Sequence, residues 1–374
     1  MSNTIILAKN FAPLLDEVYQ RESVTRDLTG DPAMARAGAN AKEIVYPQIA
    51  VTGLGEYDRN SGYTEGTVDF KWVSTEYNYD RGAKLSVDAM DNQETYKLAF
   101  GMAGAELMRT KVAPEADAFT FATLAGIEGI SKGEAKKIVT AEEFLAELLE
   151  AKNTMDNDEV PEEGRILYAT ANLLNALVMM DTYKSKEILA GFTIKKPVPQ
   201  GRFYTSIDLL DGKSAGEEAG HYRKGTAKYE KTKDITPVTS KTYYTESGGV
   251  YSPVAGSSAS AGSMSSYYEM VQEAAKSINF MIIHKPAIIK HDKHVVSNVI
   301  PASANPDADA DIIKYRKYGI VDVYKNKVAG IYLRHQAYEV VYEDSRYGSN
   351  SKRCSTETGD RRSESRECST DTGD

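Results

Sequence analysis

The chain has 374 residues, a formal net charge of −9 at pH 7 and 41% hydrophobic residues. This length and apolar content suffice for a large core in two or three structural units and exclude disorder of the whole chain. The acidic excess is opposite to the charge of proteins that grip nucleic acid through its phosphates. The two cysteines, Cys354 and Cys368, lie in a polar C-terminal tail, which excludes a disulfide scaffold and favours a reducing cytoplasm.

The start of the chain carries no basic segment followed by a long apolar run, and no stretch approaches the roughly 20 apolar residues that cross a bilayer. We therefore predict neither secretion nor a membrane partner. Residues 1–42 predict a loosely structured arm, in which "FAPLLDEVYQRES" has the pattern of a short helix.

The next segment, residues 43–90, has the composition of strands. "EIVYPQIAV" and "TVDFKWVSTEYNYDRGAKLSVDAM" carry the β-branched and aromatic residues that strands favour. Between them "TGLGEYDRNSGYTEG" is polar and rich in glycine. We predict a long β-hairpin with a flexible polar tip. Because its strands show little apolar alternation, the hairpin is expected to need a partner surface.

A long helix is predicted over residues 94–124. Tyr96, Phe100, Ala103 and Leu107 repeat at the spacing of one helical face. A helix of this length would span roughly 45 Å at about 1.5 Å per residue. Pro114 removes a backbone donor, so we expect the helix to kink or restart there.

An α/β unit is predicted over residues 155–270. It follows a capping box formed by Thr140 and Glu143 at the start of a helix with an apolar stripe. Within the unit, "RILYAT" predicts a short strand and "NLLNALVMMD" a buried helix. The polar stretch 213–268 interrupts the unit and indicates a β-rich insertion or an ordered surface loop.

The C-terminal third predicts more strands and then a tail. "INFMIIHKPAIIKHDKHVV" indicates a buried strand followed by a second one. "DADADIIKYRKYGIVDVYKNKVAGIYLR" indicates two strands joined by a turn at residues 325–327. In residues 348–374, "CSTETGD" returns as "CSTDTGD" with almost no apolar residue, which predicts a disordered repeat tail.

Two patterns have the residue types of metal sites. His291, Asp292 and His294 fit a metal site less well than a solvent-facing strand or turn, since no cysteine lies near them. "DADAD" at 307–311 resembles a calcium loop, but Ile312 and Tyr318 occupy the positions that need glycine and glutamate. A capped turn before a strand is the better interpretation, and we predict no metal.

Two further motifs lack the surrounding sequence that their chemistry requires. Gly53 and Gly55 begin a dinucleotide-type glycine pattern, but its third position is Asp58 and no nucleotide fold follows. The aspartic-protease triplet at 371–373 lies in the polar tail, where two carboxylates cannot meet in an apolar site. We predict no catalytic residue and no cofactor.

Several long blocks nevertheless resemble one family in the order that the family has them. They are "ANAKEIVYPQIAVTGLGEYDRNSGY", "YNYDRGAKLSVDAMDNQET", "AFGMAGAELMRTKVAPEADAFTFATLA", "RFYTSIDLLDG", "INFMIIHKPAIIKHDKHVV" and "DADADIIKYRKYGIVDVYKNKVAGIYL". Through them the chain resembles major capsid proteins of tailed double-stranded-DNA bacteriophages, in the group that infects low-GC Gram-positive bacteria.

The resemblance implies an α+β fold of the Hong Kong phage capsid type, with an extended E-loop hairpin, a spine helix with a P-domain sheet, and an α/β axial A-domain. The implied division is an N-terminal arm (1–42), the E-loop (43–90), the P-domain with its spine helix (91–154), the A-domain (155–270) with an insertion (213–268), a return to A- and P-domain strands (271–347), and the tail (348–374). The insertion and the tail depart from the family pattern.

The implied function is a shell of hexamers and pentamers that forms an icosahedral head around double-stranded DNA, in the virion and, during assembly, in the host cytoplasm. The implied partners are further copies of the chain, a separate scaffolding protein and a portal. The double-stranded DNA is enclosed without sequence-specific binding, and the acidic balance suits an inner wall to which DNA does not stick. The candidate inter-subunit contacts are Tyr57, Asp58, Arg59, Glu106, Arg109 and Lys111. The alternatives are an encapsulin-type compartment around enzymes, a hydrolase using paired carboxylates, and a surface adhesin built on the insertion.

Overall fold

The computed structural model describes residues 23–30, 36–37, 42–57, 59, 63, 65–90, 98–180, 182–213, 221–234 and 236–337. The helix predicted in "FAPLLDEVYQRES" lies outside the described residues, apart from its final serine. The tail predicted over 348–374 lies wholly outside them.

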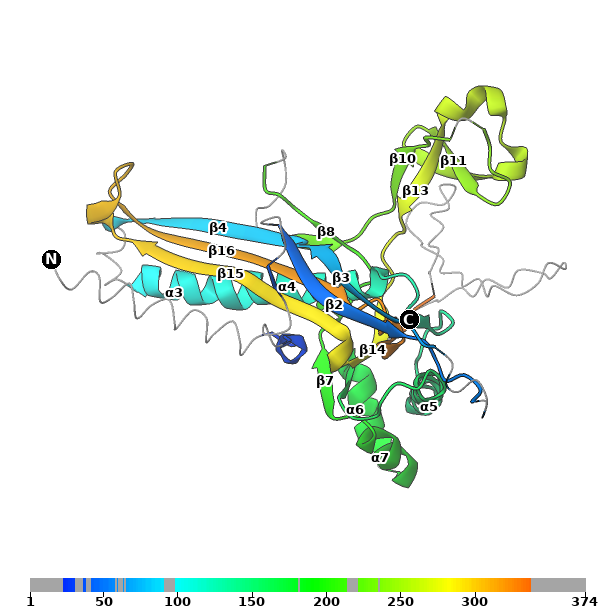
Figure 1. Ribbon diagram of the computed structural model, residues 1–374. Helices are drawn as coiled ribbons and strands as arrows, with labels where there is room; N and C mark the ends of the chain where they lie inside the picture. The colour runs from blue at the N-terminus through cyan, green and yellow to red at the C-terminus, as the bar shows by residue number, and fades with distance from the viewer. Residues whose placement is uncertain are drawn as a thin grey trace, which may run out of the picture.

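The fold is mixed α+β and elongated (Figure 1), as predicted for its class. Its helices are α3 (Leu98–Leu107), the π-helical η3 (Met108–Val112), α4 (Ala113–Gly126), α5 (Ala141–Asn157), α6 (Ala171–Met180) and α7 (Tyr183–Ala190). Its strands are β1 (Arg36–Ala37), β2 (Glu43–Val51), β3 (Val68–Glu76), β4 (Tyr79–Asp88), β5 (Ser131–Lys132), β6 (Arg165–Thr170), β7 (Ile194–Val198), β8 (Ile207–Leu209), β9 (Tyr222–Lys224), β10 (Lys228–Lys231), β11 (Thr242–Ser247), β12 (Val250–Ala255), β13 (Tyr267–Gln272), β14 (Ile278–His284), β15 (Ile288–Ile300), β16 (Ala310–Val323) and β17 (Ile331–His335).

The predicted long helix is confirmed as α3, η3 and α4, which follow one another without a break from Leu98 to Gly126. Pro114 stands in the first turn of α4, directly after the π-helical turn. Val112 and Ala113 keep right-handed helical dihedral angles, so the helix restarts there without leaving its path. The wider turn accommodates the proline ring and its missing N–H.

A long three-stranded antiparallel sheet, in the order β15–β16–β4, runs alongside this helix (Figure 1). Met108 of the helix packs against Tyr315 of β16. The ring of Phe119 lies 4.9 Å from that of Tyr79 on β4. These contacts fix the helix on one face of the sheet.

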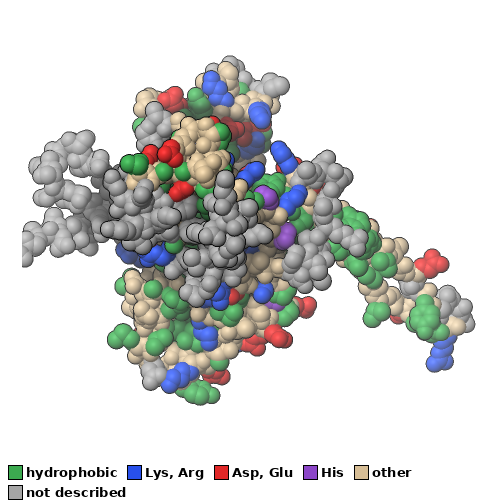
Figure 2. Space-filling model, turned by 90° about the vertical axis from the view of Figure 1, so that its left-hand side faces the viewer, with side chains coloured by type: hydrophobic (Ala, Val, Ile, Leu, Met, Phe, Trp, Pro, Cys, Tyr) green, Lys and Arg blue, Asp and Glu red, His purple; other side chains and the backbone are tan. Residues whose placement is uncertain are grey.

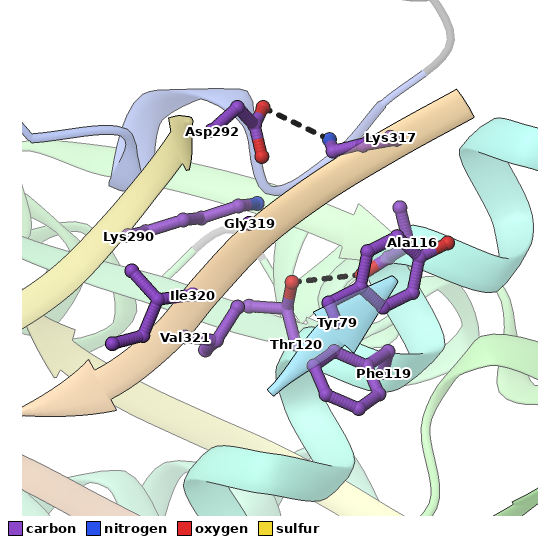
Figure 3. A pocket seen from close by; sticks show the side chains of 10 residues that line it. All are labelled: Tyr79, Ala116, Phe119, Thr120, Lys290, Asp292, Lys317, Gly319, Ile320 and Val321. Atoms are coloured by element: carbon purple, nitrogen blue, oxygen red, sulfur yellow. Dashed lines mark hydrogen bonds and ion pairs between the residues drawn. The ribbon is translucent and has the colours of Figure 1, made fainter. Parts of the chain in front are cut away.

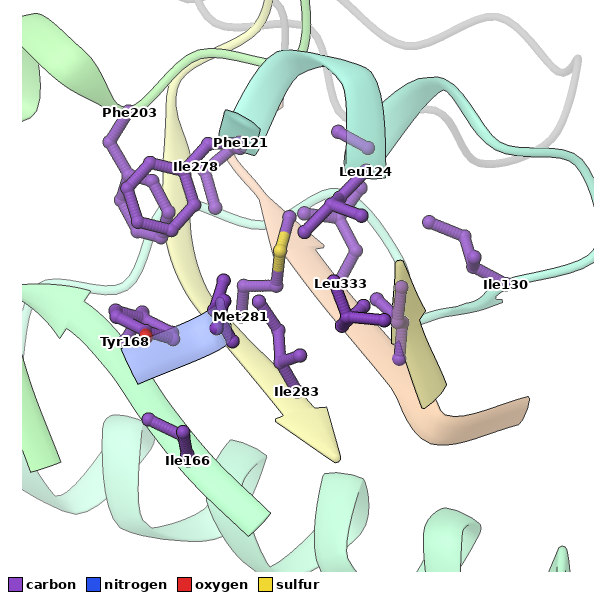
Figure 4. Close-up of a cluster of buried hydrophobic side chains, with 14 of the residues drawn as sticks. Phe121, Leu124, Ile130, Ile166, Tyr168, Phe203, Ile278, Met281, Ile283 and Leu333 are labelled. Atoms are coloured by element: carbon purple, nitrogen blue, oxygen red, sulfur yellow. The ribbon is translucent and has the colours of Figure 1, made fainter. Parts of the chain in front are cut away.

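A five-stranded mixed sheet, in the order β5–β17–β14–β6–β7, forms the centre of the molecule. All seven residues of β14 are buried, because both faces of the sheet are covered. Met281 and Ile283 join Phe121 and Leu124 of α4 on one face (Figure 4). Phe280 lies on the other face, where α5 and α6 pack. The predicted buried strand is therefore confirmed.

The helix α5 begins at the predicted capping box. Thr140 Oγ1 accepts from Glu143 N at 3.2 Å, and the Glu143 carboxylate accepts from Thr140 N at 3.3 Å. Phe144 and Leu148 are fully buried against the central sheet. The helix predicted as buried, α6, is only half covered, because Met179 is 86% exposed. Its position at the end of the layer, with α7 beyond it, leaves that face uncovered (Figure 1).

The strand predicted from "TVDFKWVSTEYNYDRGAKLSVDAM" divides into β3 and β4, which belong to different sheets. β3 pairs with β2 in the hairpin, whereas β4 pairs with β16. Asn78 stands at the division, and its side-chain amide donates to Val321 O at 2.8 Å and accepts from Val321 N at 3.1 Å. The side chain thus extends the β4–β16 ladder while the backbone turns away.

The polar stretch forms a separate four-stranded antiparallel sheet, in the order β10–β13–β11–β12, so the β-rich interpretation holds. The sheet reaches Gln272, beyond the predicted limit at 268. It has a small buried centre of its own. Tyr243 is fully buried and donates to Asp234 at 2.8 Å. The polar composition therefore still provides a packed centre, built on tyrosine.

Residues 23–30, expected within a loose arm, lie against the body. Asp117 of α4 is fully buried and accepts hydrogen bonds from Ser23, Val24 and Thr25 at 2.7–3.1 Å. Leu28 is fully buried in the central apolar cluster. The Asp117 carboxylate on the long helix is therefore one of the groups that fix this segment.

Candidate assembly surfaces

The hairpin of β2 and β3 is anchored only at its root. Ile44 and Tyr46 are buried with Ile289 and Ile320 of the long sheet. Beyond Tyr46 the strands remain paired with each other up to Val51 and Val68. Pro47 and Ile49 still line a groove of about 580 Å³ together with Ile289 and Tyr324 of the body. Most residues of the distal half are exposed in the described structure, as the burial pattern of β2 and β3 shows.

One face of this distal half is apolar and exposed. Residues directly opposite in antiparallel strands share a face, and the register pairs Pro47 with Trp72, Ile49 with Phe70, and Val51 with Val68. The exposed fractions are 58% for Ile49, 67% for Val51, 68% for Val68, 51% for Phe70 and 48% for Trp72. Figure 2 shows a narrow arm projecting to the right, with hydrophobic side chains along it. A continuous exposed apolar face of this kind marks an interaction surface.

The apolar face corrects the expectation that the hairpin has little apolar alternation. Val68, Phe70 and Trp72 alternate with Asp69 and Lys71, which is a period of two residues. The contacts predicted near the tip are polar and do not include these side chains. The signal that identifies them is the alternation within β3 combined with its register against β2.

The tip contains the predicted contacts Tyr57 and Arg59, whereas Asp58 lies outside the described residues. Tyr57 is 59% exposed, and its ring lies 4.9 Å from the ring of Tyr63. Thr52 closes the base of the tip, because its Oγ1 accepts from Thr67 N at 2.8 Å. The tip thus offers exposed aromatic side chains at the end of the apolar face.

The charged helix residues occupy two different places. Glu106 and Arg109 form an ion pair of 2.9 Å within one turn, and their side chains are both more than half exposed. Lys111 is only partly exposed and lines a cavity between the helix and β9. Glu106 and Arg109, two of the three predicted contacts, are therefore paired with each other. The third, Lys111, lies at the cavity beside β9.

A second exposed apolar surface lies where α6 meets α7, at the lower end of the molecule in Figure 1. Val178, Met179 and Tyr183 are 67%, 86% and 80% exposed. Beside them, a groove of about 590 Å³ between α5 and α7 is lined by Leu145 and Ile188, among others. This end of the helical layer has the same character as the hairpin face.

The pocket between α4 and the long sheet has a volume of only about 10 Å³, the space of a single water molecule (Figure 3). Lys290 and Lys317 line it, and both are at most 5% exposed. Lys317 forms an ion pair of 3.0 Å with Asp292. A substrate has no room beside these groups, so the pocket is structural.

Lys290 also contacts the N-terminal segment, residues 23–30. Its Nζ donates to Thr25 O at 3.1 Å and to Thr25 Oγ1 at 2.6 Å. Complete burial, followed by repulsion from Lys317, lowers the pKa of Lys290 to about 8. The carboxylate of Asp117 favours the charged form and limits this decrease.

The described residues contain no group of three or more His, Cys, Asp or Glu side chains placed to hold a metal ion. His291 and His294 lie on β15, opposite Ile320 and Tyr318. The "DADAD" segment leads into β16, where Asp311 Oδ1 accepts from Ala302 N at 2.8 Å. In the part of the chain that the structure describes, no helix is long and apolar enough to cross a membrane.

No protein-family model matches the sequence, and no curated protein matches it. Among solved structures, the chain is similar to the capsid of the cyanophage P-SCSP1u (11% identity, 84% of this chain and 88% of that one, TM-score 0.47). It is also similar to a virus-like particle from Pyrococcus furiosus (12%, 88% and 99%, 0.47) and to a protein of Mycobacterium phage Che8 (12%, 83% and 90%, 0.42).

Proposed function

We propose that this chain is the major capsid protein of a tailed double-stranded-DNA phage, a subunit whose many copies form a closed shell. The observation that carries the proposal is the apolar face of the hairpin. Its side chains project from the body on a two-stranded arm, and such an arm gains stability only when another surface covers it. Head-to-tail contacts of this kind generate closed rings and shells.

The order of elements supports the same proposal. A projecting hairpin, a long helix beside a long sheet, a helix-covered mixed sheet and returning strands follow one another along the chain. This is the order that the resemblance to phage capsid proteins implies. We propose that the hairpin is the E-loop, that the long helix and sheet form the P-domain, and that the central sheet with the insertion forms the A-domain.

The predicted contacts enter the proposal with different weights. Tyr57 and Arg59 lie in the tip beyond the paired strands, and we propose that they touch the same neighbour as the apolar face. Glu106 and Arg109 already satisfy each other, and surface pairs of this kind contribute little. The scaffolding protein, the portal and the host group rest on the sequence resemblance alone.

The test compares two double variants of β3. Phe70→Ser with Trp72→Ser removes the apolar face, whereas Asp69→Ser with Lys71→Ser changes the opposite face of the same strand. We expect the first to remain folded and fail to form particles in electron microscopy, and the second to assemble normally. Normal shells from the first variant would refute the hairpin's role.

The contents of the particles distinguish the alternative. A phage head encloses double-stranded DNA when its packaging partners are present, whereas an encapsulin-type compartment encloses protein. Particles isolated from the natural source should therefore contain nuclease-protected DNA. Particles filled with an enzyme and free of DNA would replace the phage proposal with the compartment.

A further inference from the structure

A basic groove of about 340 Å³ lies between the long helix and the ribbon of β8 and β9. Lys111 of the helix lines one side, and Tyr204, His221, Tyr222, Arg223 and Lys224 line the other. Three of these residues are cations at neutral pH, and no carboxylate lines the groove within the described residues. In a chain of net charge −9, this is a local reversal of sign.

Asp208 of β8, an acidic group close to Arg223, already has other partners. Asp208 of β8 forms an ion pair with Lys228 at 2.6 Å and accepts from Thr226 N at 3.0 Å. Burial acts to raise the pKa of Asp208, but the Lys228 and Thr226 hydrogen bonds outweigh it and hold the pKa at about 2. Arg223 reaches Asp208 only at 3.7 Å, its side chain is 57% exposed, and it lines the groove.

Aromatic rings stand among the cations. Lys224 Nζ lies 5.7 Å above the centre of the Tyr204 ring. The Tyr222 hydroxyl donates to Gly201 O at 3.1 Å, which fixes that ring, and the His221 ring stacks beside it at 6.1 Å. Fixed rings beside Lys and Arg side chains are the combination with which proteins hold a nucleic-acid backbone and its bases.

We propose that this groove binds the phosphodiester backbone of nucleic acid without sequence preference. The inference rests on the proposed function, which places such a polyanion next to the shell. Arg223 and Lys224 neutralise phosphates, and Lys111 adds a third positive charge on the facing helix. A few cations give weak binding to one subunit, and the many copies of a shell multiply it.

The segment 214–220 precedes His221 in the sequence and contains Glu217 and Glu218. It lies outside the described residues. A variant with Glu217→Gln and Glu218→Gln is therefore included in the experiment, and we expect it to bind nucleic acid at least as tightly as the unchanged chain.

The experiment measures fluorescence anisotropy of a labelled 20-nucleotide DNA with unassembled protein at low salt. Arg223→Gln with Lys224→Gln should weaken binding at least tenfold and reduce the slope of log K against log salt by about 2. The matched control, Lys231→Gln with Lys233→Gln in and after β10, removes the same charge and should change binding less than twofold. Pyrophosphate should displace the DNA from the unchanged chain, which tests the groove without any variant.

Binding that survives in the Arg223 and Lys224 variant would overturn the proposal, as would binding that appears only after the two glutamates are replaced. Poly-glutamate is also tested as a competitor for the labelled DNA. If it displaces the DNA as effectively as unlabelled DNA of equal charge does, the groove takes an acidic protein segment instead. Particle formation by the same proteins is recorded separately. A protein that binds DNA but never assembles would refute the shell and leave the groove intact.

Discussion

The strands β14 and β3 are both rich in large apolar residues, but β14 is wholly buried and β3 is mostly exposed. Phe280 of β14 is fully buried between α5 and the neighbouring strands, whereas Phe70 of β3 is 51% exposed. A continuous apolar run is typical of a strand covered on both faces, and an alternating run is typical of one covered on a single face. In β3 that face is largely exposed within the described chain, which is why we propose that its apolar residues contact another molecule.

The largest expected effect on stability comes from a truncation in β14. Phe280→Ala removes a ring that lies 5.5 Å from Phe144, inside a closed layer. We expect it to lower the free energy of unfolding by about 3–5 kcal/mol, from lost burial and the cavity left behind. Urea unfolding of unassembled protein measures this. Phe70→Ala should cost under about 1 kcal/mol in the same assay, and equal costs would show that the hairpin packs within the subunit.

The next effect concerns the buried charges under residues 23–30. The pKa of Lys290 lies below its ordinary value of 10.5, at about 8, so the unfolded state binds more protons between these two values. Stability should therefore rise as pH increases from about 8 to 10.5, by up to about 3 kcal/mol.

The measurement compares urea unfolding at pH 8 and 9.5, below the range in which buried tyrosines oppose the trend. In Lys290→Met the rise should disappear, although that variant also loses its bonds to Thr25. An equally steep rise in the variant would show that another group causes it.

The smallest effect is expected at the exposed ion pair. Glu106→Gln removes the partner of Arg109 on a surface turn, so the free energy of unfolding should change by less than about 0.5 kcal/mol. Particle yield should change less than with the Phe70 and Trp72 variant. A loss of assembly as large as that of the Phe70 and Trp72 variant would show that this ion pair is a principal contact between subunits.

The sequence predicts those elements whose signals are local. The capping box of Thr140 and Glu143 and the apolar run of β14 needed only near neighbours in the chain, and both predictions are confirmed. The division between β3 and β4 was missed, because it depends on Asn78 meeting Val321, which is 243 residues away.

The site was predicted less completely than the fold. Tip residues such as Tyr57 were predicted as contacts because the glycine-rich, polar composition of the tip is visible in the sequence alone. The face formed by Ile49, Phe70 and Trp72 appears only when the register of β2 against β3 is known. Likewise the basic groove unites Lys111 with Arg223, and only the packing of β9 on the long helix brings them together.

The most direct measurement uses Trp72, the only tryptophan in the chain. In the free subunit its side chain is 48% exposed, so its fluorescence should be quenched by acrylamide. If a second copy covers the hairpin face, assembly into particles should shift its emission to shorter wavelength and lower the quenching constant severalfold. Particles whose Trp72 remains as accessible as in the free subunit would contradict the central claim that this face is the assembly surface.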